Sequence, residues 1–317
     1  MAHPERFALH FDATYRLLSL SLKPSTRARY QGGVDCFRQF LCHYLSLTAL
    51  PRSFRSSAVR LDRLFATFTM FAFEDDLPFS SVKAAFWGLK KLNPQLGKFG
   101  LPVSFSLVCK SWQRLRPSKS ALPISWPLTC LLAATLLESG HTRAAVLALL
   151  SFDCYLRVNE GCTLLKEDVV WVEGLPSLRL RNTKTGGLQD QFVAARHPDV
   201  CRLLHRVWSA TEPGHRLFPF SAVSFRSRLR RAERSLGFPV HFTPHSFRHG
   251  GASHDLRSGC PIAEVVLRGR WASVESSRRY FQQHRARFLE VLSLAAESAL
   301  GVRISRCLLG LFAGAVF

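Results

Sequence analysis

Residues 169–194, with the sequence VVWVEGLPSLRLRNTKTGGLQDQFVA, decide the fold class because their pattern differs from that of the rest of the chain. Short runs rich in β-branched and other apolar residues predict three strands, at 169–172, 178–181 and 191–194. Gly174 and Pro176 mark the first turn, and the run Thr183-Lys184-Thr185-Gly186-Gly187 marks the second. Connections this short indicate a small antiparallel sheet.

Helical patterns surround this sheet on both sides. After it, they resume at Asp199 and continue to residue 300. Before it, apolar residues recur every three or four positions, as on one face of a helix. This spacing predicts helices at 25–44, 61–71, 80–92, 128–137 and 143–152. The chain is therefore expected to be mainly α-helical with one small antiparallel β-sheet.

A break near residue 120 predicts more than one domain. The segment 110–119 has four basic residues and no acidic one, and Pro117 and Pro123 interrupt regular structure there. The length of 317 residues also fits about two domains. We expect a helical domain at 1–119, a mixed α/β domain at 120–290 and a helical tail at 291–317.

The charge balance is the strongest global feature. Lys and Arg number 43 against 22 Asp and Glu, and the net charge of +21 favours a polyanionic partner such as nucleic acid. The nine cysteines are scattered and form no Cys-x-x-Cys pair, which argues against a structural zinc site and for free thiols in a reducing compartment. The N-terminus lacks the apolar core of a signal peptide, and the apolar stretch 307–317 is too short to span a membrane. We expect an intracellular protein.

Arg157 stands out in the segment 155–160, YLRVNE, because it ends an apolar helical pattern where a buried side chain is expected. A buried guanidinium needs an acidic partner or an anionic ligand. Glu160, three residues on, can be that partner. The planar guanidinium also suits two phosphate oxygens. Taken alone, the motif is explained as well by an ion pair within a helix.

Residues 244–249, PHSFRH, predict the start of a helix, with Thr243 as N-cap and Pro244 as its first residue. His245 and Arg248 then share one face at a helix N-terminus. Helix N-termini favour anions, so this segment is a candidate phosphate site.

The same region also suggests a possible metal site, because His241, His245 and His249 are four residues apart. Pro244 prevents His241 from sharing the helix, and no carboxylate or thiol lies close by in the sequence. We therefore expect no metal ion here.

Tyr280 is a candidate nucleophile within 277–281, SRRYF, nine residues after Trp271. An isolated phenol is a weak nucleophile at neutral pH, and a lone tyrosine is usually structural. Of the five tyrosines, Tyr280 alone follows directly on two arginines, whose charge would favour loss of the phenol proton.

The order of these residues resembles the tyrosine recombinase family, also called the phage integrases. The resemblance covers about residues 125–290, and the residues that carry it are Arg157, Lys184, His245, Arg248, Trp271 and Tyr280. It implies a catalytic domain at 120–290. The helical region 1–119 is similar to the core-binding domain of that family, with Ser25-Thr26-x-x-x-Tyr30 in its opening helix.

The resemblance also implies a mechanism. Tyr280 would attack a DNA phosphate, form a 3′-phosphotyrosine and release a 5′-hydroxyl. Arg157 and Arg248 would bind the non-bridging oxygens, and His245 would help to move the proton of the nucleophile. The energy of the phosphodiester is kept in the phosphotyrosine, so no metal or other cofactor is implied.

Further roles follow from the same resemblance. Lys184, on the strand turn, would protonate the leaving 5′-oxygen, with Lys166 as a rival. Trp271 would donate its indole N–H, and Glu160 would support the site. In the run Gly269-Arg270-Trp271, an arginine stands where the commoner family pattern has glycine. This form is similar to recombinases of mobile elements, including retroelements of the DIRS kind.

Two further regions have an expected role. Arg226, Arg230 and Arg234 belong to the densest basic run and, with Lys119, would contact DNA phosphates; a solvated helix face and a solvated loop are the alternatives. The apolar tail 291–317 resembles the C-terminal helix that this family often docks on a neighbouring protomer, with packing on its own chain as the alternative.

The leading interpretation is a site-specific DNA recombinase or integrase of a mobile element. Alternatives are an enzyme similar to type IB topoisomerases, which relaxes supercoiled DNA, and a DNA-binding protein without catalysis. The expected partners are double-stranded DNA and further copies of the chain, as a dimer on one site and a tetramer in synapsis. The compartment would be the nucleus in a eukaryote and the cytoplasm in a bacterium.

Overall fold

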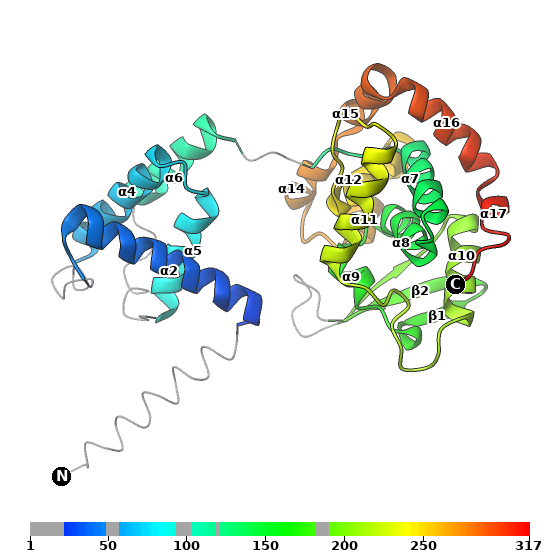
Figure 1. Ribbon diagram of the computed structural model, residues 1–317, viewed down its shortest axis with the longest axis horizontal. Coiled ribbons are helices and arrows are strands. Elements are labelled where there is room, and N and C mark those ends of the chain that lie inside the picture. Colours follow the sequence, from blue (N-terminus) through cyan, green and yellow to red (C-terminus); the bar gives the residue numbers. More distant parts are fainter. Residues whose placement is uncertain (1–21, 49–56, 93–102, 118–120, 182–189) are drawn as a thin grey trace, which may run out of the picture. The chain divides into compact units, whose positions relative to one another are not determined.

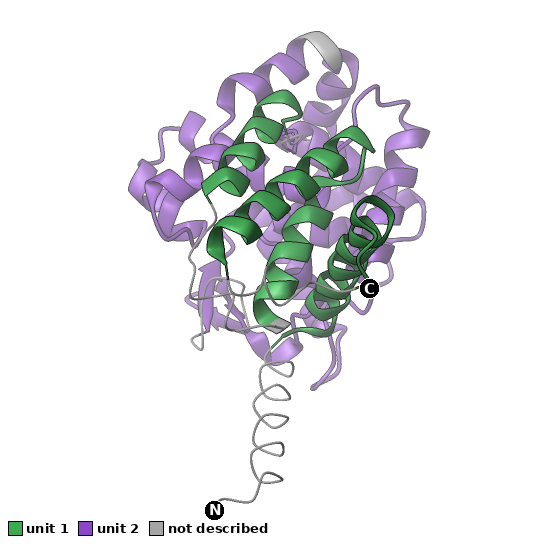
Figure 2. Cartoon of the chain, turned by 90° about the vertical axis from the view of Figure 1, so that its left-hand side faces the viewer, with its two compact units in different colours: residues 1–119 green, residues 120–317 purple. Residues whose placement is uncertain are grey.

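The computed structural model describes residues 22–48, 57–92, 103–117, 121–181 and 190–317, without the side chains of Leu92, Leu292 and Ser293. The chain forms two compact units, residues 1–119 and 120–317 (Figure 2). Within the described ranges, no helix has the length and apolar character needed to cross a membrane.

The first unit is helical. Its described helices are α2 (Pro24–Leu45), α4 (Ala58–Glu74), α5 (Phe79–Leu92) and α6 (Val103–Leu115) (Figure 1). Phenylalanines form its core, with Phe37 stacked on Phe65 at 5.2 Å and edge-on to Phe68 at 5.1 Å. Helix α6 corrects one expectation, because Lys110 and Arg114, assigned above to the break between the domains, lie on this helix.

The second unit is built around two buried helices, α7 (Trp126–Glu138) and α8 (Thr142–Asp153). Nine consecutive residues of each are buried, which explains why their sequences are apolar on every side. The other helices surround them: α9 (Val158–Cys162), α10 (Pro198–Ser209), α11 (Ala222–Ser235), α12 (Pro244–Arg257), α13 (Ile262–Arg268), α14 (Val274–Ser277), α15 (Gln283–Phe288), α16 (Ala295–Arg306) and α17 (Leu308–Leu311).

The sheet is antiparallel with the order β1-β2-β3. Its strands are β1 (Val169–Val172), β2 (Leu175–Leu180) and β3 (Gln191–Ala194). The predicted fold class is confirmed, and the first and third strands have the predicted bounds. The second begins at Leu175, so Pro176 lies within β2 opposite Trp171 rather than in the turn. Buried Asp168 bonds Arg179 and Arg181 of this hairpin at 3.1 and 2.6 Å.

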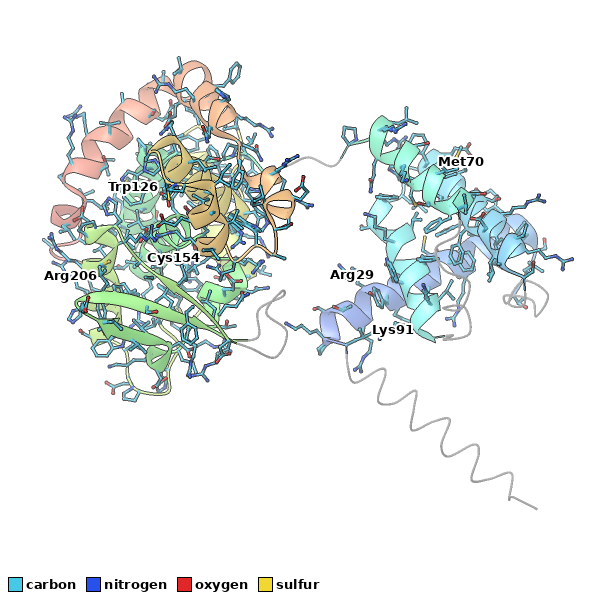
Figure 3. The ribbon with its side chains drawn as sticks, turned by 180° about the vertical axis from the view of Figure 1, so that it is seen from behind. Arg29, Met70, Lys91, Trp126, Cys154 and Arg206 are labelled. Carbon is cyan, nitrogen blue, oxygen red and sulfur yellow. The ribbon has the colours of Figure 1, made fainter. Side chains whose placement is uncertain are left out.

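The tail packs on its own chain in this structure. Helix α16 runs along α7 (Figure 1), and a Cβ at Gly301 would lie 2.2 Å from the carbonyl oxygen of Pro127. Leu308 and Phe312 are buried, and Arg206 (labelled in Figure 3) donates a hydrogen bond of 2.8 Å to the carbonyl of Phe312. Part of the apolar surface of the tail is thus covered in cis, whereas Val291, Leu300 and Val316 stay exposed. Exchange of the tail between two chains stays a prediction.

Candidate active site

Arg157 is placed by a break between two helices. Helix α8 ends at Asp153, Tyr155 follows with a φ of +48°, and Arg157 is the N-cap of α9. This corrects the sequence interpretation, in which Arg157 ended the apolar helix. A left-handed conformation is unfavourable for a residue with a side chain, so tertiary contacts must hold Tyr155 in place.

Glu160 connects two arginines. Its carboxylate accepts a hydrogen bond of 2.5 Å from Arg157 Nη1 and one of 2.9 Å from Arg270 Nη2. The backbone N–H of Arg157 donates a third, of 2.8 Å. Burial opposes the charge of Glu160, but Arg270 and Arg157 hold its pKa below the ordinary value. The ion pair expected between Arg157 and Glu160 is therefore present, within a larger network.

Arg248 lies at the centre of the site. Its side chain has no exposed surface, and it donates to the carbonyl of Tyr155 and, at 2.5 Å, to that of Gly269. Helix α12 comes this close because it has glycines, since a Cβ at Gly251 would lie 2.1 Å from the carbonyl oxygen of Phe152. Burial, together with the charges of neighbouring arginines, lowers the pKa of Arg248.

Arg270 is a component of the site that the sequence reasoning missed. It has a φ of +55°, is 8% exposed and donates to Glu160 and to the carbonyls of Cys154, Tyr155 and Arg268. Burial lowers its pKa even though Glu160 opposes the shift. The available signal was an arginine in the position where glycine is common, because glycine is the residue that a positive φ favours.

The Tyr280 ring lies in an aromatic cluster. Its centroid is 4.7 Å from that of Trp271, 4.6 Å from that of His249 and 5.8 Å from that of His245. The guanidinium carbon of Arg248 is 4.7 Å from the Trp271 ring and 5.3 Å from the Tyr280 ring. The structure therefore brings together four of the six residues that carry the resemblance. The Tyr155 carbonyl accepts from Arg248 and Arg270, and Arg270 is connected to Arg157 through Glu160.

His249 is the second residue that the sequence did not identify, having been considered there only as a metal ligand. It is 3% exposed, and its Nδ1 accepts a hydrogen bond of 2.8 Å from the side-chain amide of Gln282. Burial and the nearby His245 and arginines lower its pKa to about 3. His249 is thus a neutral ring that packs on Tyr280 at neutral pH.

This arrangement can bind and polarise an anion. The buried Nε of Arg248 and the indole N–H of Trp271 have no hydrogen-bond partner within the described structure. Buried donors normally have partners. Unpaired donors on two residues that also contact Tyr280 fit a site for phosphate oxygens beside the phenol.

The structure describes some of the remaining candidate residues and not others. Lys184 and Lys119 fall outside the described residues. Lys166, the rival of Lys184, donates a hydrogen bond of 2.5 Å to the carbonyl of Thr211 and lies over the Trp208 ring. The three arginines expected to contact DNA are exposed on α11: Arg226, Arg230 and Arg234.

The possible metal ligands do not converge. His241 precedes α12 and bonds Glu233, whereas His245 and His249 are on the helix. Throughout the described ranges, no group of three or more His, Cys, Asp or Glu side chains could hold a metal ion.

Comparison with known proteins places these features in context. The model of the phage integrase family matches residues 128–287. A lambda integrase dimer bound to a COC′ core site has a similar structure, with a TM-score of 0.61 and 14% identity over 86% of this chain and 94% of that one. The post-cleavage complex of the XerH site-specific recombinase is also similar, with a TM-score of 0.58 and 14% identity over 85% of this chain and 79% of that one. The Tn1549 transposon integrase in complex with transposon right-end DNA has a TM-score of 0.56 and 14% identity over 86% of this chain and 95% of that one. No curated protein sequence matches the chain.

Proposed function

Because the chain belongs to the phage integrase family of tyrosine recombinases, we propose that Tyr280 is the nucleophile with which it cuts and rejoins DNA. The observation that supports this assignment is the contact of the Tyr280 ring with Trp271 and Arg248, both of which have unpaired buried donors. The protein is a site-specific recombinase.

In the cleavage step, Tyr280 Oη attacks the phosphorus and the bond to the 5′-oxygen breaks. Arg157 and Arg248 stabilise the negative charge on the non-bridging oxygens, as donors in an oxyanion hole do. His245 takes the phenol proton, and Lys184 gives a proton to the leaving 5′-oxygen. Attack by a 5′-hydroxyl on the phosphotyrosine reverses the same steps and joins the strands.

Trp271 and Glu160 support these groups. The indole N–H of Trp271 donates to a phosphate oxygen, and Glu160 orients Arg157 through their ion pair. Arg248 has no exposed surface, so the rings of Tyr280 and Trp271 must shift before a phosphate reaches it.

A covalent-adduct assay tests the nucleophile. Wild-type protein is incubated with nicked suicide duplexes carrying candidate sites and is analysed on denaturing gels. Tyr280→Phe should form no adduct, whereas Tyr44→Phe, which changes an exposed tyrosine of α2, should react like wild type. An adduct with Tyr280→Phe would refute the assignment. Relaxation of supercoiled DNA without strand exchange would instead favour a topoisomerase-like activity.

The resemblance extends the proposal to the partners. Residues 1–119 serve as the core-binding domain and residues 120–290 as the catalytic domain on double-stranded DNA. Two copies bind one DNA site, and four copies form the synapse. The compartment is the nucleus in a eukaryote and the cytoplasm in a bacterium. Support comes from the net charge of +21 and from the DNA present in the three similar structures.

A further inference from the structure

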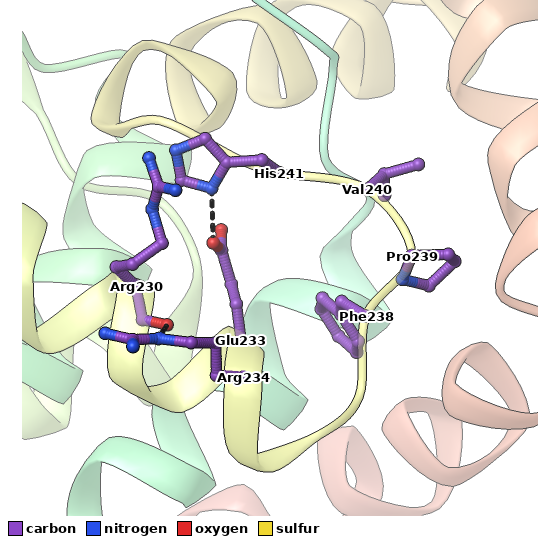
Figure 4. A pocket seen from close by; sticks show the side chains of 7 residues that line it. All are labelled: Arg230, Glu233, Arg234, Phe238, Pro239, Val240 and His241. Atoms are coloured by element: carbon purple, nitrogen blue, oxygen red, sulfur yellow. Dashed lines mark hydrogen bonds and ion pairs between the residues drawn. The ribbon is translucent and has the colours of Figure 1, made fainter.

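A cavity of about 390 Å³ lies where α11 ends and the chain turns back toward α12 (Figure 4). Three residues of α11 line it, together with the loop residues 238–241. The lining is mixed, with Arg230, Arg234 and His241 beside an apolar wall from the loop. None of the residues placed above around Tyr280 takes part in it.

Buried Glu233 fixes the orientation of His241. Glu233 is 3% exposed, its Oε2 lies 2.5 Å from Nδ1 of His241, and its Oε1 accepts a hydrogen bond of 2.8 Å from the backbone N–H of Phe242. Burial raises the pKa of Glu233, although His241 and that N–H act in the opposite direction. With both carboxylate oxygens bonded and Nδ1 engaged, Nε2 is the polar atom of the ring left for a ligand.

Among the described residues, the two arginines of the cavity, Arg230 and Arg234, form no ion pair, although the charge of Arg230 acts on nearby Glu233. Arg234 Nε donates a weak hydrogen bond of 3.4 Å to the carbonyl of Arg230. Glu233 is the single acid of the lining, and it is already bonded to His241. Cationic side chains without a counterion around a concave surface fit an anionic ligand.

We propose that this cavity binds a sugar–phosphate unit of the DNA backbone, with Arg230, Arg234 and His241 contacting the phosphate and Glu233 positioning His241. The apolar wall formed by residues 238–240 packs against the deoxyribose. His241 precedes His245 by four residues along the chain. The inference rests on the proposed function, because it requires DNA on this face of the second unit.

The salt dependence of binding tests the inference without knowledge of the target site. Affinity of the full-length protein for a random-sequence duplex is measured by fluorescence anisotropy over a series of salt concentrations. Each lost arginine–phosphate contact should lower the slope of log K against log salt by about 0.9. Arg230→Ala, Arg234→Ala and His241→Gln should each weaken binding about tenfold at low salt. Arg231→Ala, the matched control, removes an exposed arginine of α11 outside the cavity.

The role of Glu233 needs a readout that a general loss of stability would not give. Glu233→Gln should weaken binding in the wild-type chain and have no further effect in His241→Gln, since it acts through that ring. An unchanged slope for Arg230→Ala and Arg234→Ala, or an equal loss in Arg231→Ala, would overturn the inference. If wild type forms the covalent adduct while the slopes are unchanged, the cavity proposal fails and the proposed function stands. Absence of both binding and adduct would refute both.

Discussion

Replacing Arg270 with glycine tests the network beneath the candidate active site. Arg270 and Glu160 form an ion pair of 2.9 Å with side chains 4% and 6% exposed. Removing one member of a buried pair costs roughly 3–5 kcal/mol. Glycine also relieves the unfavourable φ of +55°, which returns about 1–2 kcal/mol. Arg270→Gly should therefore destabilise the second unit by about 1–4 kcal/mol.

The effect on catalysis follows from Glu160. Without Arg270, Glu160 keeps Arg157 as its single ion-pair partner, and the Tyr155 carbonyl loses one of its two guanidinium donors. A shift of Arg157 away from the phosphate should slow adduct formation about tenfold to a hundredfold, as for other small misplacements of catalytic groups.

The assay combines urea denaturation followed by tryptophan fluorescence with single-turnover adduct formation on a suicide duplex. The matched control is Glu173→Gly in the β1–β2 turn, where an exposed residue has a φ of +50°. This change relieves the same backbone strain without removing a buried contact, so it should leave stability unchanged or raise it by about 1 kcal/mol. The reasoning is refuted if Arg270→Gly matches Glu173→Gly in both stability and adduct rate.

Three further predictions concern other parts of the chain. In the folded chain the pKa of His249 is lowered to about 3, whereas in the unfolded chain it is about 6.5. As the pH falls below about 6.5, the unfolded chain therefore takes up a proton on His249 that the folded chain does not. Stability should fall with a slope of up to about 1.4 kcal/mol per pH unit between pH 6.5 and 5, and His249→Gln should lack this component in urea titrations; parallel pH profiles would contradict it. On α2, Gly33→Ala should destabilise by about 1–3 kcal/mol, since its Cβ would lie 2.3 Å from the backbone nitrogen of Ala85, whereas Gly32→Ala meets nothing within 4 Å and should stabilise by about 1 kcal/mol; equal unfolding free energies would refute this packing. Gly301→Ala should loosen α16 from Pro127 and expose the tail to limited proteolysis, and unchanged cleavage would show that the contact is absent in solution.

The sequence predicted the elements whose signals are local. Thr243 and Pro244 mark the start of α12 as expected, and short runs of β-branched and other apolar residues predicted β1 and β3. The shift of β2 has a simple cause. Pro176 reads as a turn residue, but its missing N–H is tolerated in this strand, where its carbonyl still accepts a bond of 3.0 Å from Ala195.

The site was less accessible because long-range contacts create it. Tyr155 adopts a positive φ, and its carbonyl accepts hydrogen bonds from the guanidinium groups of Arg248 and Arg270. These arginines lie 93 and 115 positions away in the sequence. No local pattern shows such a contact, so the helix break before Arg157 was not predicted. His249 was noticed only as one of three histidines, because its packing on Tyr280 depends on how α12 meets the turn at 278–280.

The buried pair of Arg270 and Glu160 has a consequence for the evolution of such chains. A glycine at position 270 fits the backbone without support, whereas an arginine there needs the carboxylate of Glu160 to balance its charge. Replacing Arg270 alone or Glu160 alone leaves the other charge without its partner in this pair. The effects of substitutions at these two positions should therefore not be additive. Homologues with arginine before the tryptophan should retain an acid at position 160, which also orients Arg157. If a homologue replaced arginine by glycine at position 270, the acid at position 160 would remain from the earlier ion pair.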